Sequence, residues 1–294
     1  MIASSRLRVM SHTPFSVHYA NYYEYEVEFM PKPKVGLALG SGAARGLANL
    51  GVLQVLEEEQ IPIDMIAGTS AGAVVGCLYA SGSDLHVLAA MLEELDWSDL
   101  TSWTLQRRGL VSPDKIYNML KILTRNANFE DLKIPAAVVA TDLRRGSEVV
   151  LESGSVADAV RASLSIPGVF VPTEIEGRLL VDGALVNRVP SDVCRRMGAD
   201  VVIAVDVGFA PLRTNIRNLP DVIVQTIDIL SRQAAAHQGI DADVLILPDL
   251  GNVSLTQLNR SAEIIEKGRQ AAIASLNTIR DKLALFDSRN RESS

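Results

Sequence analysis

The sequence predicts an α/β fold in which helices cover both faces of a central β-sheet. Two segments, 35–39 and 201–207, are predominantly apolar, as is typical of strands that are buried on both faces. Segments with helical periodicity separate the predicted strands, which favours a layered arrangement of helices and sheet. The chain has 294 residues and is 48% hydrophobic, so it is able to bury a sizeable core in one large domain or two small ones.

The first part of the chain is interpreted as an extension that precedes the main body. Residues 1–33 are expected to be poorly ordered, although the segment 22–29 alternates loosely and also fits an added edge strand. Two prolines, at 31 and 33, separate this extension from the rest. Residues 34–208 are expected to form the core of the fold, and residues 209–286 are expected to complete the same domain with helices and a strand.

The elements at the start of the body follow in order from the spacing of apolar residues. A buried strand (35–39) leads through a glycine-rich turn into a helix (47–60), and a strand near Met65 leads into a helix that ends near Tyr79. Two further helical segments are expected, at 85–95 and 116–123. We expect both to pack on the sheet rather than to form a lid over a groove.

The remaining elements are predicted from the same two periodicities, about 3.6 residues for helices and short apolar or alternating runs for strands. In order, they are strands at 136–141 and 148–151, a helix at 156–164, a hairpin turn within 175–180, a strand at 201–207, a helix at 220–238, a strand at 244–247 and an amphipathic closing helix at 261–285.

Composition excludes several classes of function. The net charge of −7 and the pI of about 5.2 argue against a nucleic-acid-binding surface. Cys77 and Cys194 lack metal-ligand spacing and are interpreted as reduced core thiols, which suits a cytoplasmic protein. No apolar stretch approaches the 18 residues of a membrane span, and polar residues interrupt the N-terminus where a signal peptide needs an apolar run.

The sequence Gly-x-Ser-x-Gly lies between the strand near Met65 and the helix that follows it, and it is formed by Gly68, Thr69, Ser70, Ala71 and Gly72. A serine on a sharp strand-to-helix turn needs small neighbours, because a Cβ at either glycine would crowd the turn. The turn places the hydroxyl at the start of a helix, where amide groups and the helix dipole favour developing negative charge. This arrangement predicts a nucleophilic serine.

A second glycine-rich turn follows the strand at 35–39 and consists of Gly40, Ser41, Gly42, Ala43, Ala44, Arg45 and Gly46. Three interpretations compete. A dinucleotide-binding fingerprint would need its third glycine where Arg45 stands, and a plain tight turn is the second interpretation. The favoured interpretation is an anion cradle, in which successive amide N–H groups of small residues point at one oxygen.

A nucleophilic serine needs a base that takes its proton, and histidine is the usual one. Of the four histidines, His12 and His18 lie in the extension and His86 is expected to be solvated. His237 remains a candidate base, because it follows Ser70 and an acidic residue in the chain, as the histidine of α/β-hydrolases does. It is expected to lie near the end of a helix, where the ordinary role of a histidine is to interact with the helix dipole.

Carboxylates are the alternative base. Three aspartates follow apolar runs, namely Asp142, Asp182 and Asp206. Asp182 is the strongest candidate, because the small residues Gly183 and Ala184 follow it and form a turn. The other two are interpreted as turn aspartates. A carboxyl group of pKa about 3.9 is a weak base, but desolvation raises that value, and each donor of an oxyanion cradle contributes about 3–4 kcal/mol. Such a pair suits hydrolysis of acyl esters or thioesters rather than of peptides.

Four ordered motifs within residues 34–208 resemble the patatin-like phospholipase family in its bacterial form. They are the glycine-rich turn with Leu47, the Gly-x-Ser-x-Gly sequence, the block Ala162-Ser163-Leu164-Ser165-Ile166-Pro167, and Asp182-Gly183-Ala184 followed by Asn187 and Pro190. The chain departs from the family where Ser41, Ala43 and Ala44 interrupt a glycine run, and where Asn49 replaces a histidine that is common in bacterial relatives.

The resemblance implies a three-layer α/β/α fold with a mostly parallel central sheet. It also implies a lipid acyl hydrolase that uses no metal and no cofactor, with Ser70 as nucleophile and Asp182 as base. In the family, the backbone around Gly40, Gly42 and Ala43 would form an oxyanion hole, and Arg45 would brace the loop.

Three functions are therefore weighed. The first is a serine acyl-ester hydrolase of phospholipase, lysophospholipase or esterase type that acts through Ser70 and Asp182. The second is a triad hydrolase that uses His237, and the third is a nucleotide-binding or scaffold protein whose serine does no chemistry. The expected partner is a lipid or acyl-ester substrate, with transient contact at a membrane surface. The acidic composition disfavours strong binding to anionic lipid.

Overall fold

The computed structural model describes residues 32–94, 102–106, 109–112, 114–209, 216 and 219–292. The expected N-terminal extension, with its candidate edge strand at 22–29, lies outside the described residues.

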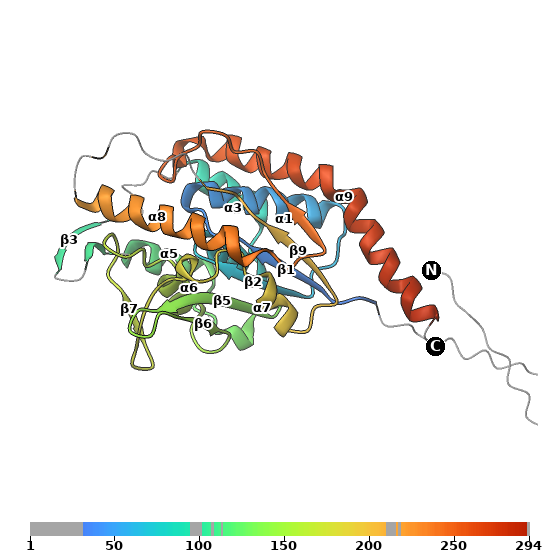
Figure 1. Cartoon of the computed structure of the whole chain (residues 1–294), viewed down its shortest axis with the longest axis horizontal. Coiled ribbons are helices and arrows are strands. Elements are labelled where there is room, and N and C mark those ends of the chain that lie inside the picture. Colours follow the sequence, from blue (N-terminus) through green and yellow to red (C-terminus); the bar gives the residue numbers. More distant parts are fainter. Residues whose placement is uncertain are drawn as a thin grey trace, which may run out of the picture.

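Among the described residues, eight strands form one mixed sheet with helices on both faces, which confirms the predicted α/β class (Figure 1). Five strands are parallel, in the spatial order β10 (Val244–Ile246), β9 (Val201–Val205), β1 (Val35–Leu39), β2 (Met65–Thr69) and β5 (Ala136–Asp142). Three antiparallel strands extend the sheet beyond them, namely β6 (Ser147–Leu151), β7 (Thr173–Ile175) and β8 (Arg178–Asp182). Every residue of β1, β2, β5 and β9 is buried, as their apolar runs predict.

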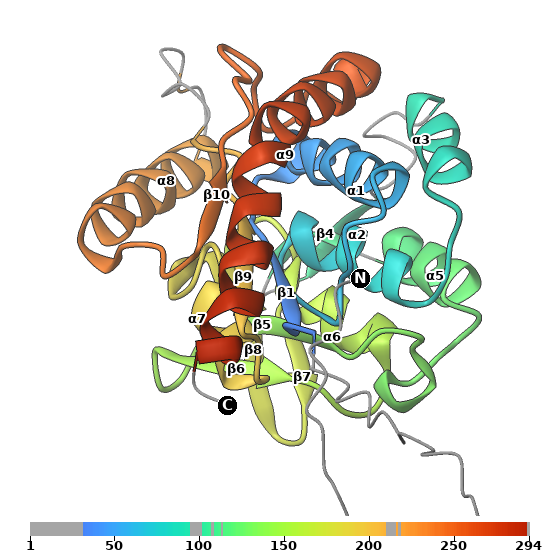
Figure 2. The same ribbon diagram turned by 90° about the vertical axis from the view of Figure 1, so that its right-hand side faces the viewer.

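The larger helical layer covers one face of this sheet. It contains α1 (Ala48–Glu58), α2 (Ala71–Ala80), α6 (Val156–Ser163) and α9 (Ser261–Glu292). Leu37 and Leu39 of β1 pack into the core under this layer, whereas Ala38 packs toward the short helix α7 (Ser191–Arg196) on the other face. Helix α9 lies alongside α1 and extends past the body of the molecule (Figures 1 and 2).

The remaining described elements surround these layers. They are α3 (Leu85–Glu93), α5 (Asp114–Leu123), α8 (Leu219–Gln238), the hairpin of β3 (Ser102–Gln106) and β4 (Gly109–Ser112), and the short 3-10 helices η1 (Ala43–Leu47), η2 (Phe129–Asp131), η3 (Gly183–Leu185) and η4 (Leu258–Arg260). Helix α3 packs mainly on α1 and α9, and α5 packs on α6 and α2. The prediction that these two helices lie on the sheet is therefore wrong, because other helices lie between them and the strands: α1 and α9 beneath α3, and α2 and α6 beneath α5.

One edge of β5 is shared by two strands that approach from opposite ends. Residues 136–139 of β5 pair with parallel β2, residues 140–142 pair with antiparallel β8, and β6 takes the opposite edge. Thr69, the last residue of β2, lies opposite Val139, and Asp182, the last residue of β8, lies opposite Ala140. The residue that follows Thr69 is thus brought directly to the end of β8.

Two further sequence-based expectations concern cysteines and membranes. Cys77 and Cys194 are buried and unbonded to each other, and burial raises the pKa of both thiols to about 12. Across the described part of the chain, no helix has the length and apolar character that a membrane crossing requires.

Candidate active site

Ser70 lies on the turn between β2 and α2. Its backbone angles are φ 53° and ψ −119°, a conformation that residues with a side chain rarely adopt and that costs on the order of 1–3 kcal/mol. A Cβ at Gly72 would lie 2.1 Å from the carbonyl oxygen of Leu39, and a Cβ at Gly68 would lie 2.6 Å from the Cα of Ala73. Glycine is therefore needed on both sides of the serine, because the turn packs against β1 and against the first turn of its own helix.

The Ser70 hydroxyl points at a carboxylate. Its Oγ donates a hydrogen bond of 2.8 Å to Oδ2 of Asp182, and the two side chains belong to residues that are only 3% and 5% exposed. The other oxygen, Oδ1, accepts the N–H of Ala184 at 2.8 Å. The hydroxyl of Thr141 donates to the backbone carbonyl of Asp182 at 2.8 Å. The carboxylate is therefore oriented by the backbone of its own turn and by β5.

Burial raises the pKa of Asp182 from 3.8 to about 6. Three interactions oppose this effect and keep the pKa from rising further: the hydrogen bonds from Ala184 and Ser70, and the positive charge of Arg188. At neutral pH the carboxyl group is ionised, yet it is a stronger base than an exposed aspartate. This electrostatic environment suits a group that takes a proton from Ser70 and returns it.

The distance between Ser70 and Asp182 also bears on the triad hypothesis. A hydrogen bond of 2.8 Å leaves no space for an imidazole ring between the two groups. His86 lines a separate groove with Glu58 and Arg269. His12, His18 and the side chain of His237 lie outside the described part of the chain, so the case for the dyad depends on this distance.

Most backbone amides of the glycine-rich loop donate hydrogen bonds within the protein, which leaves few for a ligand. Four of its amides donate to backbone carbonyls at 3.0–3.1 Å: Gly40 to Val205, Ser41 to Arg188, Ala44 to Leu255 and Arg45 to Gly42. Among the described residues, no acceptor is found for the amides of Gly42 and Ala43. The expectation that Gly40 contributes an amide to an oxyanion hole is thus corrected, because its N–H continues the ladder with β9.

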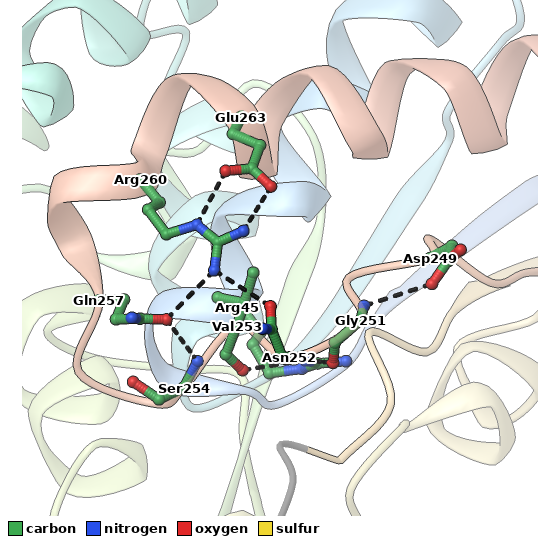
Figure 3. A network of polar contacts seen from close by, with 9 residues as sticks. All are labelled: Arg45, Asp249, Gly251, Asn252, Val253, Ser254, Gln257, Arg260 and Glu263. Atoms are coloured by element: carbon green, nitrogen blue, oxygen red, sulfur yellow. Dashed lines mark hydrogen bonds and ion pairs between the residues drawn. The ribbon is translucent and has the colours of Figure 1, made fainter.

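The loop is held in place by packing and by Arg45. A Cβ at Gly46 would lie 2.4 Å from the Cβ of Ala71, so the loop rests directly on the start of α2. The Arg45 guanidinium donates to the carbonyl of Val207 at 2.9 and 3.1 Å, to that of Val253 at 3.0 Å and to that of Gly251 at 3.3 Å. Burial lowers its pKa. Figure 3 shows Arg45 pointing at the 251–253 segment, whose middle residue, Asn252, accepts a hydrogen bond of 3.4 Å from Arg260.

Asn49, the residue that departs from the resemblance described above, also contacts this loop. The side chain is fully buried, and its Nδ2 donates to the carbonyl of Gly40 at 3.0 Å. Its Oδ1 has no hydrogen-bond partner among the described residues. Asn49 therefore supplies a donor to the loop backbone.

Ser70 lies in the wall of an apolar cavity of about 120 Å³. It is the only polar side chain among the described residues that line this cavity. The apolar lining comes chiefly from α2, α3, α5 and the segment after α6: Ala71, Val74, Val75, Leu78, Leu88, Met91, Leu92, Ile116, Met119, Leu123, Leu164, Ile166 and Phe170. The two helices that were expected to lie on the sheet are instead walls of the cavity, and Ala43 of the glycine-rich loop also lines it.

The other predicted aspartates are turn residues, as expected. Oδ1 of Asp142 accepts the amides of Arg144 and Arg145, and Oδ1 of Asp206 accepts the amide of Gly208. Within the described ranges, no three His, Cys, Asp or Glu side chains are grouped as ligands of a metal ion.

Comparison with known proteins shows which family the chain matches. The model of the patatin-like phospholipase family matches residues 37–195, which is more than half of the chain. The uncharacterized NTE family protein Rv1063c of Mycobacterium tuberculosis is 35% identical over 212 residues, which cover 71% of this chain and 59% of that protein. Neuropathy target esterase sws of Drosophila melanogaster is 35% identical over 184 residues, 59% of this chain and 13% of that protein.

The chain thus spans less than two thirds of the length of both relatives. Among solved structures, VipD from Legionella pneumophila matches with a TM-score of 0.60 at 15% identity, over 91% of this chain and 70% of that chain. This likeness supports the fold.

Proposed function

The chain belongs to the patatin-like phospholipase family, and we propose that it hydrolyses acyl esters of lipids through a dyad of Ser70 and Asp182. One observation carries the proposal: the Ser70 hydroxyl donates to the Asp182 carboxylate at 2.8 Å, in the wall of an apolar cavity. The family contributes the reaction class, and the residues of this chain contribute the mechanism.

The first half of the reaction forms an acyl-enzyme. Oγ of Ser70 attacks the ester carbonyl carbon while its proton passes to Oδ2 of Asp182. The carbonyl oxygen becomes an oxyanion, and the amides of Gly42 and Ala43 are proposed to donate to it. The C–O bond to the alcohol then breaks, and the alcohol leaves with the proton that Asp182 had accepted.

The second half releases the fatty acid. A water molecule attacks the acyl carbon of the ester on Ser70, and Asp182 takes one of its protons. When the bond from the acyl carbon to Oγ breaks, Asp182 returns the proton to Oγ and the carboxylic acid leaves. Both halves use the same carboxylate, whose pKa of about 6 lies close to neutral pH and so suits both the uptake and the return of a proton.

The cavity favours an acyl chain as the group that is bound. Along α2, the lining residues Ala71, Val74, Val75 and Leu78 follow Ser70 on one face of the helix. From Ser70 to Leu78 this face extends about 12 Å. A nucleotide would need polar or charged partners that such walls do not offer, so the cavity argues against the nucleotide-binding alternative.

The experiment compares the wild type with three variants on a panel of phospholipid, lysophospholipid, neutral ester, acyl thioester and short-chain nitrophenyl ester. Ser70→Ala and Asp182→Asn are expected to reduce turnover at least ~1,000-fold, because nucleophile and base act as one unit. The matched control is Ser275→Ala, which removes a serine hydroxyl that donates to the Ala271 carbonyl on α9. Substantial activity in Ser70→Ala, with the wild-type pattern of substrates, would contradict the proposal.

Contact with a membrane surface remains a prediction of the sequence. Val87 on α3 and Ile122 on α5 support it, because they are 65% and 76% exposed on the two helices that form walls of the cavity. Sedimentation with neutral phosphatidylcholine vesicles measures this contact, and equal recovery of wild type and Val87→Ser/Ile122→Ser in the pellet would contradict it.

A further inference from the structure

Ser163, the last residue of α6, connects the backbones of two neighbouring strands through its hydroxyl. Its Oγ accepts the N–H of Ser70 at 2.7 Å and donates to the carbonyl of Val139 at 2.6 Å. The residue is completely buried. Both backbone groups are therefore satisfied by one side chain, which comes from a helix rather than from the sheet.

This contact stands where the β-ladder would form its next hydrogen bond. In the parallel pair of β2 and β5, the amide of Ile66 donates to the carbonyl of Pro135, and the register runs without a shift to Thr69 opposite Val139. Advancing two residues at a time along both strands brings the amide of Ser70 to the carbonyl of Val139. The Ser163 hydroxyl occupies this place, and the strand pairing ends there.

The interruption allows Ser70 to leave the strand. A direct bond from its N–H to Val139 would hold the Thr69–Ser70 peptide in the ladder, whereas the hydroxyl sets this peptide apart from β5 at the point where Ser70 turns with a φ of 53°. With the hydroxyl between them, the two backbone groups stay hydrogen-bonded while the chain turns. The strained conformation at Ser70 is thus supported by a specific contact on its own amide.

The same short segment also contacts the base. The carbonyl of Ser165 accepts the N–H of Asp182 at 3.0 Å. A Cβ at Gly183 would lie 2.3 Å from the carbonyl oxygen of Val139, so the turn after Asp182 packs on the same carbonyl that Ser163 binds. Residues 163–165 therefore fix the backbones of both Ser70 and Asp182 against β5.

We propose that Ser163 is a positioning residue that holds Ser70 in its reactive conformation by replacing one hydrogen bond of the β-ladder. The inference rests on the proposed function, because it assigns Ser163 a role in the reactivity of Ser70. Without the hydroxyl, the amide of Ser70 loses its partner, and closing directly on Val139 is the available way to recover one. That movement draws Oγ of Ser70 away from Asp182.

The test uses the full chain with two substitutions, Ser163→Ala and Ser163→Cys. The first removes the hydroxyl, and the second keeps a side chain of similar size whose thiol is a weak donor and acceptor. Ser275→Ala is the matched control. The measurements are kcat and KM for a short-chain nitrophenyl ester, the rate of labelling by a fluorophosphonate probe per folded molecule, and the urea midpoint of unfolding.

Both variants are expected to lose roughly 10- to 100-fold in kcat and in labelling rate, since a displacement of about 1 Å has effects of this size. KM is expected to stay within about threefold, because the cavity walls are unchanged. Labelling at the wild-type rate in either variant, whatever its urea midpoint, would show that Ser163 serves only stability and would overturn the inference alone. A wild-type protein that takes no label would overturn the proposed function and this inference with it.

Discussion

Replacing Asp182 with asparagine should abolish catalysis and stabilise the fold at the same time. Asparagine has nearly the same shape, and it keeps both contacts: its oxygen accepts the N–H of Ala184, and its amide donates to Oγ of Ser70. It cannot take a proton from Ser70. It also removes a carboxylate that is held in a buried site, and this is the reason for the expected gain in stability.

The size of the gain follows from the pKa of Asp182, which is about 6 in the folded protein against an ordinary value of 3.8. Because the folded-state pKa is the higher one, the folded protein binds more protons than the unfolded chain between about pH 4 and pH 6. Ionisation therefore weakens the fold as the pH rises through this range. The full cost is about 3 kcal/mol at pH 8 and about half of that at pH 5.

We expect Asp182→Asn to raise the free energy of unfolding by about 1–3 kcal/mol at pH 8, and by clearly less at pH 5. Urea unfolding of both proteins at the two pH values measures this, with an unchanged m-value as the check that the two unfold in the same way. A variant that is less stable than wild type at pH 8, or a gain that is equal at both pH values, would refute the assignment of a buried carboxylate whose ionisation destabilises the fold.

Three further predictions concern the pH profile, the cavity and the helical layer. For a neutral ester, kcat/KM should rise with pH as Asp182 loses its proton, with its midpoint near the pKa of about 6; a flat profile from pH 5 to 8 would contradict this. Val74→Phe should obstruct the cavity one helical turn from Ser70, lowering kcat/KM for long-chain nitrophenyl esters at least ~10-fold and for acetyl or butyryl esters less than about threefold; equal losses for both would show that the chain lies elsewhere. Gly51→Ala should lower the free energy of unfolding by about 1–3 kcal/mol, since its Cβ would lie 1.9 Å from the carbonyl oxygen of Ile265; an unchanged urea midpoint would mean that α1 and α9 are not in close contact.

Much of the fold could be predicted from local patterns because each pattern has a local cause. The apolar run at 35–39 forms a buried strand, and the expected strand at 201–207 ends two residues earlier, at Val205. The expected helix at 156–164 ends one residue earlier, at Ser163. The small residues around Ser70 predict the turn, since no larger side chain fits beside β1. These features depend on residues that are neighbours in the sequence.

The features that sequence reasoning missed depend on partners far away in the chain. The amide of Gly40 donates to Val205, which is 165 positions later, so no local pattern could show that this amide is unavailable. Helices α3 and α5 have the apolar spacing of core helices, and only their packing on other helices rather than on the sheet makes them walls of a cavity. Ser163 gave one signal, its place in a family motif, but its contact with Ser70 required the register of β2 and β5.

The proposed chemistry depends most directly on whether Ser70 is a reactive nucleophile. Treatment of the native protein with a fluorophosphonate, followed by peptide mass spectrometry, measures this in a single experiment. We expect one covalent adduct per chain, located on Ser70, with labelling that slows below pH 6 and is absent from Ser70→Ala. An unlabelled wild-type protein, or an adduct on a different serine, would contradict the account.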